Sequence, residues 1–262
     1  MAAISNTNAF FDSVAAYERF MGRYARPLAK EFVQTIPLTS GQPVLDIGCG
    51  PGALTAELVA AVGAGAVTAI DPSPPFLEYC AGQYPGVTAK VAKAEDIPFA
   101  DNRFDAVFSQ LVIHFIGDLP QAGREIVRVT KPGGSVAVCT WNVERMQKIN
   151  LLPRASHAAG VEVPPLRVLE FNEAGSVAGY LESIGLVDVE ESTITVRSTY
   201  TDFEDLWNAY LAPVGPMGPW IVAQSDETKS IIKQAMSRIL GDPTGEITLS
   251  GEARVARGRV SA

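Results

Sequence analysis

The residues best suited to chemistry stand in a glycine-rich segment, residues 44–55, which joins an apolar run to a helical pattern. Gly48 and Gly50 allow the backbone to approach a ligand closely, and the start of the following helix offers free N–H groups. Asp71 ends the next apolar run, twenty-one residues after Gly50. In open α/β sheets an acid at that place accepts hydrogen bonds from a ribose diol. The spacing therefore predicts a site for a nucleotide-like cofactor.

Two classes of cofactor are compatible with this turn. Gly48, Gly50 and Ala53 match the G-x-G-x-x-A pattern of nicotinamide dinucleotide sites, which is a weak signal by itself. Asp46 lies just before the turn, where its charge suits the ammonium of a methionine moiety better than a pyrophosphate. Gly52 extends the pattern to G-x-G-x-G, which also argues against a dinucleotide. A turn that serves packing alone is the third interpretation.

The elements that must position these residues alternate along the chain. Short apolar runs bounded by Gly, Pro or charged residues predict strands at 43–47, 66–71, 87–92, 104–109 and 135–141. Helical patterns occupy 53–62, 74–83 and 119–129 between them. Such alternation indicates a parallel sheet covered by helices on both faces.

The second half of the sequence is less regular. No clear period appears between residues 143 and 172, where several prolines occur. We expect helices at 173–184, 201–211 and 220–240, and strands at 187–196 and 252–260. The whole then forms a doubly wound, mostly parallel seven-stranded α/β sheet with helical cap insertions.

Four further segments extend the pattern of the glycine turn. Together with residues 44–55, they resemble the motifs of class I S-adenosylmethionine-dependent methyltransferases. The second-strand motif corresponds to 69–73, the adenine-side loop and fourth strand to 94–99 and 104–110, and the helix and turn before the fifth strand to 125–134. The segment 17–27 is also similar to the ubiquinone/menaquinone-type branch of that family.

The resemblance implies a Rossmann-like methyltransferase fold with S-adenosyl-L-methionine as cofactor and S-adenosyl-L-homocysteine as product. It places the methionine end against Asp46 and the turn of Gly48, Cys49 and Gly50. The backbone at Ser109 and Gln110 would contact the same end.

The same resemblance assigns the nucleoside end of the cofactor. Asp71 would hold the ribose, Pro72 would lie under the adenine, and Ala94 and Glu95 would face the adenine edge. Relatives usually carry Asp where this sequence has Lys93, and a lysine cannot accept a hydrogen bond from the adenine amino group. Glu95 or a backbone carbonyl must therefore replace that contact.

Three residues outside these motifs are candidates for the site. Tyr17 and Arg26 lie on one N-terminal segment and could bind the cofactor carboxylate, although an amphipathic packing helix explains them equally well. His114 follows the fourth strand, at the edge where open sheets bind ligands. It is a candidate general base, while a histidine that lines the pocket is the simpler interpretation.

The overall composition restricts the choice of partners. The chain of 262 residues carries 29 acidic and 21 basic residues, a net charge of −8, which disfavours nucleic acid as the substrate. Three separated cysteines and two histidines offer no metal site, and we expect none. No apolar run is long enough to span a membrane and no signal peptide is evident, so we expect a cytoplasmic protein.

These observations predict an enzyme that moves a methyl group in line from S-adenosyl-L-methionine to a small-molecule acceptor. The cofactor-binding core would comprise 1–142, 173–200 and 251–262, and the acceptor-side cap 143–172 and 201–250. The alternatives are an NAD-type oxidoreductase and a non-catalytic regulator that binds the same cofactor.

Two groups of side chains in the second half have simpler interpretations. The acidic pair Glu190 and Glu191 and the basic residues near the C-terminus suggest solvated strand faces. Trp207, Tyr210 and Trp220 suit either the interior of a cap or the wall of an apolar acceptor pocket.

Overall fold

The computed structural model describes residues 13–164, 171–215 and 217–262, and its strands form one seven-stranded sheet in the order β3-β2-β1-β4-β5-β7-β6. The strands are β1 Val44–Ile47, β2 Val67–Asp71, β3 Thr88–Val91, β4 Phe104–Gln110, β5 Thr130–Trp141, β6 Val187–Tyr200 and β7 Ile247–Arg259. The first five strands pair in parallel, and β7 runs antiparallel to β5. The predicted doubly wound, mostly parallel sheet is confirmed.

The chain divides into two compact units. The sheet unit contains Ala25–Asn142, Leu169–Ile194 and Ala253–Ala262, and the helical unit contains Met1–Tyr24, Val143–Val168 and Thr195–Glu252. The expected division into a cofactor-binding core and an acceptor-side cap stays a prediction. Strands β6 and β7 each have residues in both units.

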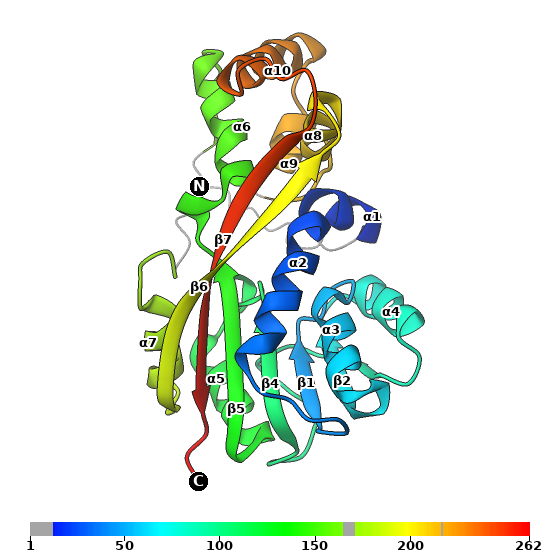
Figure 1. The fold of residues 1–262 in the computed structure, drawn as a ribbon, viewed down its shortest axis with the longest axis vertical. Helices are drawn as coiled ribbons and strands as arrows, with labels where there is room; N and C mark the ends of the chain where they lie inside the picture. Colours follow the sequence, from blue (N-terminus) through cyan, green and yellow to red (C-terminus); the bar gives the residue numbers. More distant parts are fainter. Residues whose placement is uncertain (1–12, 165–170, 216) are drawn as a thin grey trace. The chain divides into compact units, whose positions relative to one another are not determined.

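Helices occupy most of the chain between the strands. They are α1 Val14–Tyr17, α2 Arg23–Phe32, α3 Ala53–Val62, α4 Pro74–Gln83, α5 Leu119–Val129, α6 Gln147–Ala158, α7 Ser176–Ser183, α8 Phe203–Tyr210, α9 Gly218–Val222 and α10 Asp226–Ile239. Single turns of 3-10 helix lie at Val33–Thr35, Ala64–Ala66, Ile113–Phe115 and Val143–Arg145, and Glu18–Gly22 is a π-helix. Figure 1 shows β1, β4 and β5 side by side in the sheet unit.

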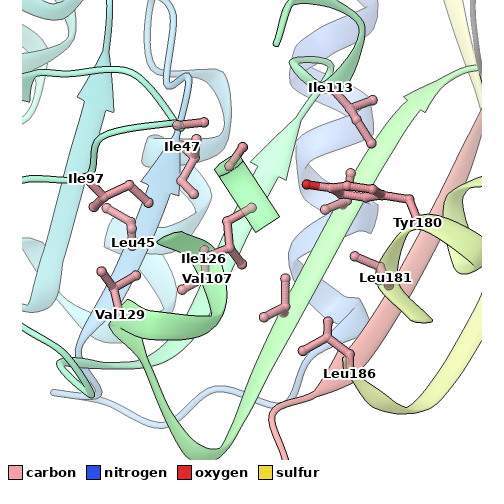
Figure 2. Packing of buried hydrophobic residues seen from close by; sticks show 14 of the residues in the cluster. Leu45, Ile47, Ile97, Val107, Ile113, Ile126, Val129, Tyr180, Leu181 and Leu186 are labelled. Carbon is pink, nitrogen blue, oxygen red and sulfur yellow. The ribbon is translucent and has the colours of Figure 1, made fainter. Parts of the chain in front are cut away.

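Helices cover both faces of the parallel strands. On one face Val107 of β4 belongs to a buried cluster with Ile126 of α5 and Leu181 of α7 (Figure 2). On the other face Phe108 meets Phe32 of α2, with ring centroids 5.7 Å apart and an edge-to-face geometry. Because neighbouring strand residues point to opposite faces, Val107 and Phe108 anchor one layer each. The parallel strands are thereby buried on both sides, as their continuous apolar runs require.

The structure differs from the sequence prediction mainly in the second half. Helix α6 forms where no period was visible, because it buries Leu151, Leu152 and Ala155 while accommodating Pro153 inside the helix. The single helix expected at 220–240 is two helices, α9 and α10. The side chain of Ser225 caps α10 by accepting from the backbone of Thr228.

Glu191, one of two adjacent acidic residues on β6, is not simply exposed to solvent. Glu191 is 12% exposed, and its carboxylate accepts from the backbone N–H groups of Gly175, Val177 and Ala178 at 2.7, 3.1 and 2.9 Å. It also lies 3.6 Å from Arg254. These donors are the free N–H groups that begin α7, so Glu191 closes the helix and complements its dipole. The expectation of a solvated face is wrong for this residue.

We predict that Glu191→Ala lowers the free energy of unfolding by about 1.5–3 kcal/mol, because three backbone N–H groups at the start of α7 lose a charged acceptor. Glu190→Ala is the matched control: Glu190 is 68% exposed and pairs only with the partly exposed Arg257. Its loss should cost less than about 0.5 kcal/mol. Urea unfolding at pH 7 measures both variants, and equal losses would contradict the capping role.

Candidate cofactor site

The glycine turn after β1 has one side packed and one side open. Gly48 has φ 71°, and a Cβ there would lie 2.4 Å from a methyl carbon of Val112. That position therefore requires glycine so that the turn can meet the loop after β4. Gly50 has φ 52°, and among the described residues no atom lies within 4 Å of its Cβ position. The backbone at Gly50 thus offers the room in which a ligand can approach closely.

Asp71 fastens this turn to the end of β2. One carboxylate oxygen accepts from the backbone N–H of Gly50 at 2.8 Å, and the other accepts from the N–H of Ser73, also at 2.8 Å. Burial raises the pKa of the Asp71 carboxyl, and the two backbone hydrogen bonds oppose that shift. Each oxygen retains a second lone pair, so the same carboxylate can accept hydrogen bonds from a ligand hydroxyl.

Asp46 is a fully buried carboxylate at the end of β1. The hydroxyl of Thr55 donates to its Oδ2 at 2.6 Å, while Oδ1 has no hydrogen-bond partner in the part of the chain that the structure describes. Burial raises the Asp46 pKa to about 7; the Thr55 hydrogen bond opposes the shift and the charge of Asp71 adds to it. A buried carboxylate with an unpaired oxygen is costly unless a cation or donor joins it.

Two more unpaired polar atoms lie on β4 and β5, the two strands that follow β1 in the sheet order. Oε1 of Gln110 at the end of β4 and the hydroxyl of Thr140 near the end of β5 are buried, and neither has a partner among residues 13–164, 171–215 and 217–262. The amide nitrogen of Gln110 donates to the carbonyl of Ala25 at 3.0 Å, which fixes the side chain. Unsatisfied groups along the carboxyl ends of adjacent parallel strands indicate a ligand-binding edge.

The backbone after β4 is strained at the same edge. Leu111 has φ 63°, a left-handed conformation that a bulky residue adopts only when its surroundings impose it. Its N–H donates to the carbonyl of Cys139 at 2.8 Å, which holds the strained residue against β5. The hydroxyl of Ser109 donates to the carbonyl of Ile47 at 3.3 Å, joining β4 to the start of the glycine turn. The predicted contacts at Ser109 and Gln110 thus lie on a rigid, preorganised segment.

Cys49 and Arg26 flank the turn within the sheet unit. The hydrogen bond with Cys80 and burial raise the pKa of the Cys49 thiol, which keeps that position neutral. Arg26 is exposed and bonds the side chain of Tyr84; burial raises the Tyr84 pKa and the charge of Arg26 lowers it. The Tyr84 ring lies 2.7 Å from the Cβ position of Gly52. The side chain of Tyr84 thus links Arg26 to the glycine turn.

The residues predicted to contact the adenine differ in burial and in hydrogen bonding. Pro72 is exposed just after β2, and Ala94 is buried. Oε1 of Glu95 accepts from the backbone N–H groups of Gly117 and Asp118 at 3.0 and 3.4 Å, so this oxygen is committed to the loop before α5. The adenine contact of Glu95 stays a prediction, and the carboxylate has a structural role as well.

Tyr17 and His114 keep their assignments as predictions. Tyr17 ends α1 in the helical unit, so the geometry of the sheet unit does not bear on it. His114 lies in the single turn Ile113–Phe115, half-buried, with its ring centroid 5.8 Å from that of Phe171. Both interpretations of His114, as a general base and as a residue that lines the pocket, stay predictions.

Thr55 and Thr140 were not recognised as site residues from the sequence. Thr55 follows Asp46 by nine residues and lies one turn into α3, a spacing that brings its hydroxyl back to the carboxylate. Thr140 had no such signal, because only the sheet order brings β5 next to β4. Among the described residues no group of three or more His, Cys, Asp or Glu could hold a metal ion. Within the same ranges, no helix is both long and apolar enough to cross a membrane.

We predict that the effect of Asp46→Asn on the free energy of unfolding depends on pH. The folded-state pKa is raised to about 7, so the folded state binds more protons than the unfolded state between about pH 4 and 7. Stability is therefore lost as the pH rises through that window. Removing the charge should stabilise the ligand-free protein by about 2–4 kcal/mol at pH 8 and have little effect below pH 4.

Thermal and urea unfolding at pH 4 and pH 8 test this dependence. The exposed Asp96, changed to Asn, is the control and should alter stability at neither pH. A destabilised Asp46→Asn variant at pH 8 would show that the carboxylate is paired in the folded protein.

Comparison with known proteins agrees with this geometry. Residues 45–138 match the model of a methyltransferase domain. An uncharacterised methyltransferase of Mycobacterium tuberculosis is 33% identical over 158 residues, which cover 60% of this chain and 61% of the relative. A malonyl-[acyl-carrier protein] O-methyltransferase of Pseudescherichia vulneris is 42% identical over 98 residues, 37% of this chain and 38% of that protein. The aligned region is thus less than two thirds of either curated relative.

The fold is also shared with solved structures. The YcgJ protein of Bacillus subtilis superimposes with a TM-score of 0.57 at 17% identity, covering 89% of this chain and 98% of that one. At that identity the likeness concerns the fold alone. Residues 45–138 thus match a methyltransferase domain, and the fold is one that solved structures share.

Proposed function

We propose that this protein transfers a methyl group from S-adenosyl-L-methionine to a small-molecule acceptor. The observation that carries the proposal is the buried, unpaired Oδ1 of Asp46, at the end of the strand that leads into the turn whose backbone is open at Gly50. A ligand that approaches Gly50 and brings an ammonium group would satisfy both. The amino acid end of S-adenosyl-L-methionine has that chemistry.

The residues of the sheet unit fit the other parts of the cofactor. Arg26 is suited to the carboxylate, since a guanidinium pairs with it through two hydrogen bonds. Asp71 already sits at the glycine turn with free lone pairs for the ribose hydroxyls. Pro72 and Ala94 would contact the adenine, with Glu95 at its edge. When bound, the cofactor supplies a methyl group on a sulfonium, which is an activated leaving group.

The task of the protein is then alignment and exclusion of water. Residues fixed by packing and backbone bonds, such as Gln110 and Leu111, can hold the acceptor in line with the methyl group. A covered site keeps competing water away from the reacting atoms. A general base is not required by this reaction, so His114 is proposed as a residue of the pocket wall.

The two alternative functions, an NAD-type oxidoreductase and a non-catalytic regulator, would use the same residues differently. A nicotinamide dinucleotide would bring a pyrophosphate toward the turn, where the buried Asp46 carboxylate would repel it. A regulator that only binds the cofactor would share the whole site. Turnover of a methyl acceptor separates that case from an enzyme.

Two features of the sequence indicate the class of the acceptor. The net charge of −8 disfavours a nucleic acid, and the motifs resemble the ubiquinone/menaquinone-type branch, whose acceptors are small molecules. We propose that the acceptor is bound with help from the segments 143–172 and 201–250, that the reaction takes place in the cytoplasm, and that no metal takes part.

We predict that S-adenosyl-L-methionine binds and that NAD does not. Asp71→Ala should weaken cofactor binding at least about tenfold, because it removes both the ribose acceptor and the hydrogen bond that shapes the turn. Asp105→Ala is the control, since Asp105 pairs with Lys131 on a partly exposed surface. Isothermal titration calorimetry measures both affinities, and equal affinities in the two variants would remove Asp71 from the site.

A further inference from the structure

Lys148 of α6 is a fully buried lysine inside the helical unit. Its ammonium donates to the carbonyl of Phe20 at 2.7 Å, within the π-helix Glu18–Gly22. It lies 4.5 Å from the ring centroid of Phe20, 5.6 Å from that of Tyr200 and 5.5 Å from that of Tyr210. Three aromatic rings and one carbonyl therefore surround the charge, which has two more N–H groups to donate.

The charges around Lys148 do not balance. Arg23 and Asp205 are the charged groups that act on it, and they neutralise each other through bonds of 2.8 and 2.6 Å. Tyr200 and Tyr210 are neutral, since burial raises the pKa of both hydroxyls. One positive charge is left over in this cluster, and in the described part of the chain no carboxylate lies within 4.0 Å of the Lys148 ammonium. Buried charges normally have a partner, and removing a single charge from water is expensive.

A small apolar hollow adjoins this cluster within the same unit. It measures about 10 Å³ and is lined by Phe20, Ile149, Leu152, Tyr210, Met217 and Gly218. Two of these residues, Phe20 and Tyr210, also cover the ammonium. The hollow holds about one water-sized group as it stands. Met217 is unbranched and adaptable, so a larger apolar group can enter when it shifts.

We propose that Lys148 binds an anionic group of the methyl acceptor, while the hollow takes the apolar part next to that group. This assignment rests on the proposed methyl transfer and narrows its substrate to an acid with an apolar body. The ligand supplies the missing negative charge, and the proposal requires the rings of Phe20 and Tyr210 to move apart so that it can reach the ammonium. The shared chemistry is that of a carboxylate or a phosphate ester.

A role as proton acceptor would require the opposite charge state. Burial first, and then the charge of Arg23, lowers the Lys148 pKa to about 7, while Asp205 opposes that shift. An anion binds the protonated form, so its affinity falls as the pH rises above 7. A general base acts in the neutral form, so its contribution increases over the same range. The direction of the pH dependence therefore separates the two roles.

The test uses four probes with one alkyl chain: hexanoate, hexyl phosphate, hexanol and hexylamine. Binding to the full chain is followed by NMR and calorimetry at pH 6 and pH 9. We expect the two anions to bind more tightly than hexanol and hexylamine not to bind. Hexanoate affinity should fall at least about tenfold from pH 6 to pH 9, because only the protonated fraction binds. The better of the two anions identifies the acid group.

Lys148→Met keeps an apolar side chain of similar length and removes the charge. It should weaken hexanoate at least about tenfold, abolish the pH dependence and leave hexanol unchanged. The partly exposed Lys229 of α10, changed to Met, is the control and should bind as the wild type does. Equal affinities for hexanoate and hexanol, an unchanged Lys148→Met variant, or no binding of any probe would overturn the proposal. If the wild type does not bind S-adenosyl-L-methionine, the proposed function is refuted instead, because that binding is measured separately.

Discussion

The hydrogen bond from the Gly50 backbone to the Asp71 carboxylate is the constraint on which the candidate site depends. It joins the turn after β1 to the end of β2, and the N–H groups of Gly48 and Cys49 support it by donating to the carbonyl of Ile70. A glycine turn has many conformations available, so a fixed anchor is needed to select one of them. Because the anchor is buried and charged, the turn keeps its shape without a ligand.

The burial of Asp46 shows what such preorganisation costs. Its carboxylate lies in an apolar sheet with one hydrogen bond from Thr55, and its raised pKa expresses the lost hydration. The same lack of hydration makes an incoming ammonium group bind more strongly, since fewer water contacts must be broken. The unpaired atoms of Gln110 and Thr140 extend this arrangement along the neighbouring strands. These unpaired buried groups lower the stability of the ligand-free protein at one edge of the sheet, and a ligand that pairs with them can raise it.

The parallel strands and their helices were predictable because each is short, apolar and bounded by turn residues. The spacing of Gly48, Gly50 and Asp71 in the sequence likewise indicated one site, and the structure places these residues together. Helix α6 was missed because Pro153 interrupts its pattern, and only tertiary packing shows which side is buried. Glu191 seemed solvated because its partners on α7 precede it by 13 to 16 residues in a separate element.

Lys148 illustrates the same limit for the helical unit. Of its aromatic neighbours, Phe20 lies 128 positions before it and Tyr210 lies 62 positions after it, so no local motif could predict the cluster. The cluster depends on the extension of β6 to Tyr200, beyond the strand that its alternation predicted. Charged residues that are far apart in the sequence come together when the elements pack, and the Lys148 ammonium is then left without a balancing negative charge.

The central claim is that the Asp46 carboxylate meets the ammonium group of the cofactor. Calorimetry of S-adenosyl-L-methionine binding at pH 7, in buffers of different ionisation enthalpy, counts the protons exchanged on binding. With a pKa of about 7 before binding, Asp46 should release about half a proton when the ammonium arrives. This release should disappear in Asp46→Asn, and binding should become weaker. Proton release that persists in the variant, or unchanged affinity, would contradict it.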